Sequence, residues 1–255
     1  MEQANKKTHL EVLINGTILR GYLDEPGQPG PHPLLIMFHG FTGDCTETKF
    51  LLTRLAKGLA EQGIASLRLS FKGSGESDGD FYDTSCLGQA MEGKAILDFA
   101  ETLPGIDHDR IALLGMSLGG FVATLVAKDR QEELKGLILL APAFRYVEKF
   151  RAVYQQTDHY WHGNLKVGRS FLEDGLSADF KGALQSLLIP VYFFHGTQDS
   201  SVDPGVSQEF SRYPKDSELT LIEGTDHGFD TKEGYLELKH GVESAACRML
   251  KPSSR

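Results

Sequence analysis

A serine in a glycine-flanked turn is the strongest candidate for chemistry in this chain. Residues 115–120 read GMSLGG, which contains the G-x-S-x-G spacing. The apolar run 110–114 before it has the length of a strand, and residues 121–127 after it predict a buried helix. A tight turn between a strand and a helix lifts the serine hydroxyl clear of the sheet, and the glycines let both elements approach closely. This context favours Ser117 as a nucleophile over a chance match in a glycine-rich chain.

A serine hydroxyl is a poor nucleophile at neutral pH, so it needs a base and a third group that orients the base. His227 lies in a glycine-flanked loop after the last predicted strand, from which it can reach across the sheet edge. We therefore interpret His227 as the base. His195 stands where a strand ends and is interpreted as structural, and His39 as a residue that orders the loop after it.

Asp199, Asp203 and Asp226 are the candidates for the orienting acid. Asp226 is adjacent to His227 and would have to fold back sharply to reach it. Asp203 precedes Pro204, a pattern typical of a helix start. Asp199 follows the end of a predicted strand and is the favoured acid.

Attack of a serine on a carbonyl carbon also requires donors for the negative oxygen that forms on the substrate. The backbone N–H of Leu118, directly after the predicted nucleophile, is the expected first donor. The backbone N–H of Phe41, in the loop 39–43 (HGFTG), is the expected second donor.

The elements that position these residues alternate between strands and helices. Asn15-Gly16 between two apolar segments predicts an opening hairpin. Strands are expected at 10–14, 17–23, 34–38, 64–71, 110–114, 134–140, 191–194 and 219–222. Strands that alternate with helices predict a mostly parallel sheet, whose sites lie at the carboxyl ends of the strands. Ser117, Asp199 and His227 each follow such an end.

Two further local patterns concern the helices and an insertion. Asp44, followed by Glu47, predicts a capping pair for a helix that continues to Gly63. Residues 144–187 interrupt the alternation, because aromatic residues lie there among charges and glycines without strand signals. We expect a single domain over residues 1–255, with a small helical cap at about 144–187 that covers a site.

Composition excludes several other classes of protein. The chain has 255 residues, 40% of them hydrophobic, which is enough for a sizeable core. Its net charge of −9 and the lack of a dense Lys/Arg cluster argue against a nucleic-acid partner. Residues 1–10 are polar, and the sequence has no run of about 18 apolar residues, the length that a membrane span needs. We therefore expect a cytoplasmic protein with no membrane partner.

Neither a metal nor a cofactor is expected. Cys45, Cys86 and Cys247 are widely spaced and lack a metal-ligand pattern, so reduced thiols are favoured over disulfides or a zinc site. Residues 73–79 (GSGESDG) begin like a dinucleotide-binding loop, but Asp78 stands where the third glycine belongs.

Several motifs together resemble bacterial α/β-hydrolases of the cinnamoyl (feruloyl) esterase type. They are 39–41 (HGF), 73–79 (GSGESDG), 115–120 (GMSLGG), 140–143 (LAPA), 195–199 (HGTQD) and 224–227 (GTDH). The resemblance covers nearly the whole chain except the cap. It implies an α/β-hydrolase fold with a mostly parallel eight-stranded sheet, flanking helices and a small cap insertion. It also implies that Ser117, Asp199 and His227 form a catalytic triad that hydrolyses carboxylic esters, including esters of hydroxycinnamic acids.

The chain departs from that family at its site. Met116 and Leu118 stand where the family usually has His and Gln, which makes the pocket more apolar. Family members that hold a phenolic hydroxyl use a tyrosine and an acidic residue of the cap. The tyrosine position corresponds to Phe171, and the acid's region reads YVEK from Tyr146. Phe171 and Tyr146 are thus the candidate substrate-binding residues, and recognition of hydroxycinnamates is left open.

The sequence therefore predicts a serine carboxylesterase for a small or medium acyl or aryl ester, in which Ser117 attacks, His227 carries the proton and Asp199 orients His227. A serine peptidase and a short-chain lipase remain alternatives on the same fold. A ligand-binding protein with little turnover is a third. Association into a homodimer is also left open.

Overall fold

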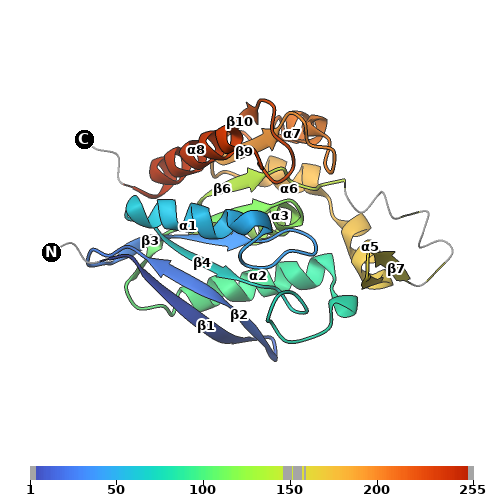
Figure 1. Ribbon diagram of the computed structural model, residues 1–255, viewed down its shortest axis with the longest axis horizontal. Helices are drawn as coiled ribbons and strands as arrows, with labels where there is room; N and C mark the ends of the chain where they lie inside the picture. Colours follow the sequence, from blue (N-terminus) through green and yellow to red (C-terminus); the bar gives the residue numbers. More distant parts are fainter. Residues whose placement is uncertain (1–3, 146–150, 152–156, 158, 252–255) are drawn as a thin grey trace.

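The computed structural model describes residues 4–145, 151, 157 and 159–251. Their centre is an eight-stranded sheet in the order β1-β2-β4-β3-β5-β6-β9-β10 (Figure 1). The strands are β1 (Lys6–Ile14), β2 (Thr17–Glu25), β3 (His32–Phe38), β4 (Ala65–Leu69), β5 (Ile106–Met116), β6 (Leu134–Leu140), β9 (Val191–Gly196) and β10 (Ser217–Ile222). β2 pairs antiparallel with β1 and β4, and the strands in the order β4-β3-β5-β6-β9-β10 pair in parallel. The predicted mostly parallel eight-stranded sheet is confirmed.

The opening hairpin turns at the predicted dipeptide. Asn15 and Gly16 have φ values of 49° and 80°, and the flanking residues Ile14 and Thr17 are paired. Positive φ at both central residues is the requirement of the tight hairpin turn that Asn-Gly favours.

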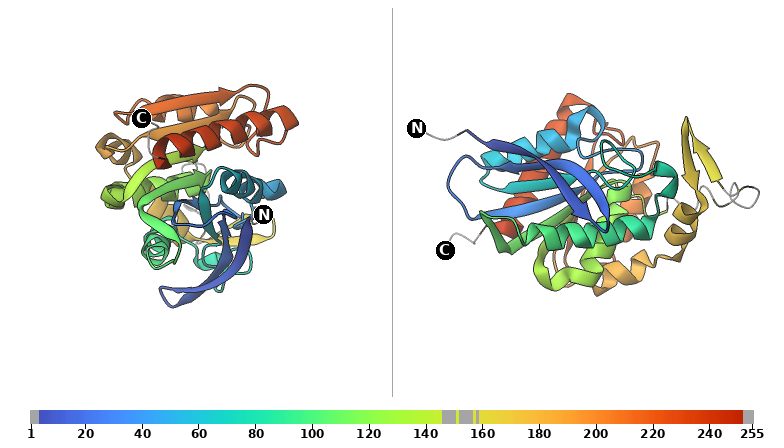
Figure 2. Two further views of the ribbon diagram at one scale, coloured as in Figure 1. Left: turned by 90° about the vertical axis from the view of Figure 1, so that its left-hand side faces the viewer. Right: turned by 90° about the horizontal axis from the view of Figure 1, so that it is seen from below.

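Helices cover both faces of the sheet (Figure 2). α1 (Leu51–Glu61) and α8 (Lys232–Leu250) pack on one face, and α2 (Cys86–Ala100) and α3 (Leu118–Arg130) pack on the other. The central strand β3 is buried along its whole length. Its alternate side chains contribute to the two opposite cores, as expected of a strand covered on both faces.

The predicted capping pair is wrong. α1 begins only at Leu51, after a 3-10 turn at Thr48–Phe50, so the two carboxylates lie too early to cap it. The Asp44 carboxylate accepts hydrogen bonds from the N–H and the hydroxyl of Thr46, both at 2.6 Å. The Glu47 carboxylate accepts from the N–H of Gly40 and so ties the loop 39–43 to this turn.

The segment between β6 and β9 is not purely helical, which corrects the expected helical cap. It contains an antiparallel pair, β7 (His159–His162) and β8 (Leu165–Gly168), before α5 (Arg169–Ser177) and α6 (Phe180–Ser186). The turn of this pair contains Gly163 at φ 59°. The Gly163-Asn164 dipeptide is the turn signal that announces it. Tyr146 lies outside the described residues.

The structure also bears on the predictions about membrane spans and cysteines. In the described part of the chain, none of the helices combines the length and apolar character needed to cross a bilayer. Cys45, Cys86 and Cys247 are free thiols.

A buried ion pair ties the sheet to the loop that follows β3. Arg68 of β4 is fully buried, and its Nη2 lies 2.8 Å from the Asp24 carboxylate of β2. Its Nη1 donates to the carbonyl oxygen of Cys45 at 3.0 Å. A buried guanidinium without its counter-ion carries a large desolvation penalty. Asp24 therefore keeps Arg68 in place, and Arg68 in turn holds the loop beside Cys45.

Replacing the counter-ion should destabilise the protein strongly. We expect Asp24→Ala to lower the free energy of unfolding by about 3–5 kcal/mol, because it leaves Arg68 buried and uncompensated. Urea unfolding measures this. The matched control is Glu218→Ala, since Glu218 pairs with Arg248 at 2.9 Å where both side chains are about half exposed. Loss of this exposed pair should cost about 1 kcal/mol or less. Equal effects of the two substitutions would contradict the account.

Candidate active site

Ser117 occupies a strained turn between β5 and α3. β5 ends at Met116 and α3 begins at Leu118. Ser117 itself has φ 53° and ψ −115°, a conformation that costs energy for a residue other than glycine. The predicted strand, turn and helix around this serine are therefore present.

The glycines beside Ser117 are required by close backbone contacts. A Cβ atom on Gly119 would lie 2.1 Å from the carbonyl oxygen of Phe38, and one on Gly115 would lie 2.2 Å from that of Gly119. Two hydrogen bonds secure the turn to the next strand and loop: the Ser117 N–H donates to the Leu140 carbonyl at 2.8 Å, and the Ala143 N–H donates to the Ser117 carbonyl at 3.0 Å. These contacts fix the strained backbone of Ser117.

The loop 39–43 passes directly beside the serine. A Cβ atom on Gly40 would lie 3.1 Å from the Cβ of Ser117. Leu118 is the first residue of α3, where backbone N–H groups have no acceptor within the helix and the helix dipole is positive. The predicted donors, Phe41 and Leu118, thus belong to two segments that flank Ser117.

His39 orders this loop, as the sequence predicted. Its Nε2 accepts from the N–H of Phe71 at 3.0 Å, so Nδ1 carries the hydrogen and donates to the Gly40 carbonyl at 2.9 Å. Burial lowers the pKa of His39, against the attraction of Glu47, and this favours the neutral ring.

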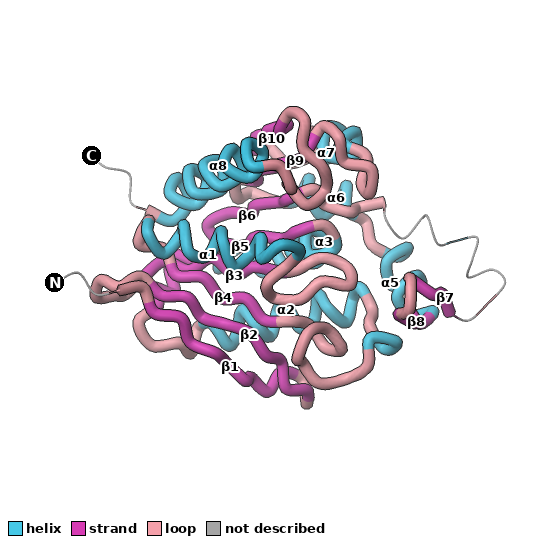
Figure 3. The backbone as a smooth tube through the Cα atoms, in the orientation of Figure 1, coloured by secondary structure: helices cyan, strands magenta, loops and turns pink. Residues whose placement is uncertain are grey.

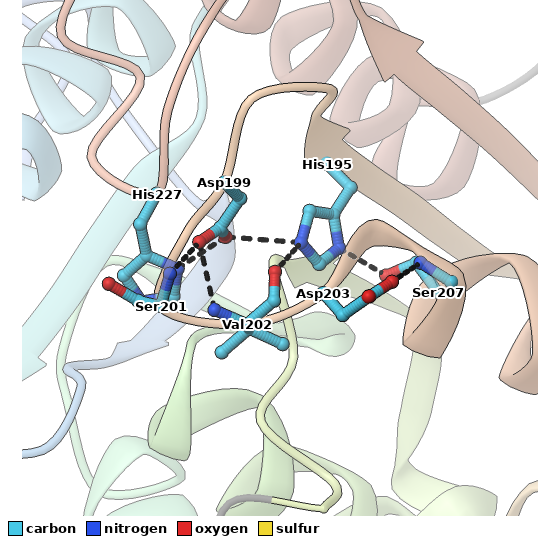
Figure 4. A network of polar contacts seen from close by, with 8 residues as sticks. His195, Asp199, Ser201, Val202, Asp203, Ser207 and His227 are labelled. Atoms are coloured by element: carbon cyan, nitrogen blue, oxygen red, sulfur yellow. Dashed lines mark hydrogen bonds and ion pairs between the residues drawn. The ribbon is translucent and has the colours of Figure 1, made fainter.

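The predicted base and its favoured acid are in contact. His227 Nδ1 lies 2.6 Å from Asp199 Oδ2 (Figure 4). Asp199 follows β9 and His227 follows β10, and these strands are neighbours in the sheet. A Cβ atom on Gly196 would lie 2.3 Å from the Thr225 carbonyl oxygen, so the two loops run against each other. Figure 3 shows these loops on the side of the molecule toward β7 and β8.

The other two acid candidates have different partners. Asp203 caps α7 (Pro204–Phe210), where its carboxylate accepts from the Gly205 N–H at 2.6 Å. The Asp226 carboxylate accepts from the Asp230 N–H at 2.9 Å. Of the three candidate acids, Asp199 is therefore the one that the structure places in contact with His227.

Asp199 is a buried carboxylate surrounded by donors. Its side chain has 0% exposure, and Oδ1 accepts from the backbone N–H of Ser201 at 2.8 Å and of Val202 at 2.9 Å. Oδ2 contacts His195 Nε2 at 3.1 Å in addition to His227. Burial favours the neutral acid, but the hydrogen bonds from His195 and His227 outweigh it and hold the pKa of Asp199 well below its usual range. Asp199 is therefore an ionised carboxylate.

An aromatic cluster lies at the loop 39–43. The Phe41 ring centroid is 4.8 Å from that of Phe171, 5.5 Å from that of Phe81 and 5.3 Å from that of His162. Phe171, a candidate substrate-binding residue, is 1% exposed. Sequence reasoning did not single out His162 for the site. The signal for it was the Gly163-Asn164 turn, because a hairpin there carries His162 on a strand beside the loop.

Comparisons with known proteins agree with this fold. The family model described as serine aminopeptidase, S33, matches residues 29–181. Est1E from Butyrivibrio proteoclasticus, solved with ferulic acid bound, is similar with a TM-score of 0.88 and 26% identity, over 95% of this chain and 100% of that one.

Curated proteins match over shorter stretches. The 2,6-dihydropseudooxynicotine hydrolase of Paenarthrobacter nicotinovorans is 26% identical over 192 residues, which are 74% of this chain and 50% of that protein. Esterase FrsA of Escherichia coli O157:H7 is 30% identical over 132 residues, which are 51% of this chain and 30% of that protein. The chain thus spans no more than about half the length of the curated relatives it matches.

The ionised state of Asp199 should appear in the pH dependence of stability. An aspartate in the unfolded chain has a pKa of about 3.9, and that of Asp199 is lower in the folded chain. As pH falls, the unfolded chain therefore takes up the proton on this aspartate before the folded chain does. The contribution of Asp199 to the free energy of unfolding is complete above the unfolded pKa and is lost as pH falls toward the folded pKa. Between pH 5 and pH 3 we expect the native protein to lose about 1 kcal/mol relative to Asp199→Asn, measured by urea unfolding. A difference that is constant between the two pH values would contradict an ionised Asp199.

Proposed function

This chain belongs to the serine aminopeptidase, S33 family, and from that premise we propose that it is a serine carboxylesterase acting on small or medium acyl or aryl esters. The α/β-hydrolase fold and the likeness to cinnamoyl esterases inferred from the sequence are both confirmed by the comparisons. The observation that carries the proposal is the 2.6 Å contact between His227 and the buried Asp199, on the sheet edge where β5 delivers Ser117.

The proposed reaction begins with Ser117. Because His227 Nδ1–H donates to the ionised Asp199, the lone pair of His227 lies on Nε2 and accepts the proton of the serine hydroxyl. The Ser117 Oγ then bonds to the ester carbonyl carbon, whose oxygen becomes negative. His227 returns the proton to the leaving alcohol as the ester C–O bond breaks. The product of this half-reaction is an acyl-enzyme on Ser117 and a free alcohol.

Water completes the cycle by the same steps. His227 takes a proton from the water molecule, whose oxygen bonds to the acyl carbon, and the bond to Ser117 Oγ breaks as the serine recovers its proton. The N–H groups of Phe41 and Leu118 are the proposed donors to the negative oxygen in both halves. Loss of one such donor costs about 3 kcal/mol in other hydrolases.

The surroundings of the site support an apolar acyl or aryl group. Leu118 and Met116, on either side of Ser117, are apolar and buried, and Phe41 lies in the aromatic cluster with Phe171. Phe171 has no hydroxyl group to offer a phenol. A preference for hydroxycinnamates would therefore have to come from residues other than Phe171.

The name of the matched family favours an aminopeptidase as the second candidate. An aminopeptidase needs an acidic group for the free amine of its substrate. Glu173 is exposed and already pairs with Arg169 at 2.6 Å, and Glu148 lies outside the described residues. Glu173 would have to exchange Arg169 for the substrate amine, and Asp174 of the same helix is the other acidic candidate for that role.

Removing the hydroxyl of Ser117 should abolish turnover. We expect Ser117→Ala to lower kcat/KM for 4-nitrophenyl butyrate by more than about 10³-fold, because the nucleophile is lost while the fold is kept. Ser177→Ala, at an exposed serine of α5, is the control and should keep full activity. Equal rates in the wild type and in Ser117→Ala would contradict the proposal. Ligand binding without turnover would instead support a binding protein.

A substrate panel should separate the esterase from its alternatives. We expect short aliphatic 4-nitrophenyl esters or methyl ferulate to give kcat/KM values at least about 100-fold above those of amino-acid 4-nitroanilides. The ratio between the ferulate and the aliphatic esters reports whether the cap accepts a phenolic acid, and tributyrin tests the lipase. Ser117-dependent cleavage of the anilides at rates like those of the esters would support the peptidase.

A further inference from the structure

A second imidazole contacts Asp199 on the side away from His227 (Figure 4). His195, the next-to-last residue of the strand β9, is fully buried. Its Nε2 lies 3.1 Å from Asp199 Oδ2 and 3.0 Å from the carbonyl oxygen of Val202. Its Nδ1 lies 2.7 Å from the Ser207 hydroxyl of α7, which is also buried. The two histidines thus share one oxygen of the same carboxylate.

These contacts define which nitrogen of His195 carries the hydrogen. The carboxylate and the carbonyl on the Nε2 side can only accept, so Nε2 is the donor. Nδ1 of the neutral ring then accepts the hydrogen of the Ser207 hydroxyl. In this arrangement every polar atom of His195 has a partner and no additional charge is buried. The Asp199 carboxylate and the Val202 carbonyl therefore select the tautomer of His195, and the Ser207 hydroxyl completes the arrangement by donating to Nδ1.

The donor from His195 controls the rotation of the Asp199 carboxylate. The N–H groups of Ser201 and Val202 come from the local turn and hold only Oδ1. On Oδ2, His195 and His227 are both donors, and His195 is the one on a strand of the sheet. Because His195 also binds the Val202 carbonyl, it holds both ends of the turn 199–202. The direction in which Oδ2 meets His227 is thus set from β9 and α7.

We propose that His195, held at Nδ1 by Ser207 of α7, is a positioning residue that orients Asp199 so that His227 presents Nε2 to Ser117. This inference rests on the proposed serine esterase activity. It differs from the interpretation of His195 as a core residue that only stabilises the end of β9. A core residue affects the amount of folded protein, whereas a positioning residue affects the rate constant of the folded protein.

The direct test replaces the donor and then restores it. His195→Leu fills the site with an apolar side chain but removes the N–H that donates to Asp199. We expect kcat per folded molecule to fall by about 10–100-fold, with KM within about threefold of the wild type. His195→Gln can place an amide N–H near the Nε2 position, and it should recover most of this loss. Ser207→Ala removes the hydrogen bond that holds Nδ1 of His195 and should lower kcat several-fold in the same direction.

The control for a loss of stability is Val206, a neighbour whose side chain makes none of these hydrogen bonds. Val206→Ala removes a buried apolar side chain of α7 and should lower the melting temperature while leaving kcat per folded molecule unchanged. Folded protein is quantified by near-ultraviolet circular dichroism before each assay. If His195→Leu does not fold, His195→Gln and Ser207→Ala supply the comparison with Val206→Ala.

These measurements distinguish failure of the positioning role from failure of the proposed esterase function. The positioning role alone would be overturned if the wild type shows Ser117-dependent turnover and kcat of folded His195→Leu or Ser207→Ala stays within twofold of the wild type. A wild type without Ser117-dependent ester hydrolysis would overturn both the proposed function and this inference. Loss of kcat with recovery in His195→Gln supports the role of the N–H donor.

Discussion

The arrangement of the site depends on one buried negative charge. A carboxylate removed from water is costly unless hydrogen-bond donors surround it. Asp199 meets this requirement with the backbone N–H groups of its own turn and with the rings of His195 and His227. These donors come from the end of β9, from the turn after it and from the loop after β10. Satisfying the charge therefore brings the ends of neighbouring strands together, and this convergence places His227.

The serine side of the site is set by backbone packing instead of charge. The strained conformation of Ser117 persists because glycines at 115 and 119 permit contacts that a side chain would block. The loop beside it is fixed by the ring of His39 and by the Glu47 carboxylate. The core strands β3 and β5 carry both the loop and the serine turn, so the distance between them is determined by the pairing of these strands. A rigid sheet thus holds groups that are far apart in the sequence.

Sequence reasoning succeeded where a short local pattern determines the structure. The Asn15-Gly16 hairpin, the apolar strands and the glycine-flanked serine each depend on nearby residues, and each is present. It failed where the partner is distant. Glu47 looked like part of the cap of α1, but it caps the 3-10 turn at Thr48 and also accepts from the N–H of Gly40, which no spacing rule announces. The interpretation of His195 as structural is not contradicted, but its position at the end of a strand did not announce its contacts with Asp199 and with Ser207 of α7. The hairpin of β7 and β8 was missed because its turn signal was outweighed by surrounding aromatic and charged residues.

Covalent labelling tests the central claim most directly, because an activated serine reacts with a fluorophosphonate whereas an ordinary serine does not. Incubation of the protein with such a probe, followed by mass spectrometry of its peptides, should show a single adduct on Ser117. Labelling should be far slower in His227→Ala, since the base that activates the serine is missing. An unmodified Ser117, or an adduct on another residue, would contradict the account of this site.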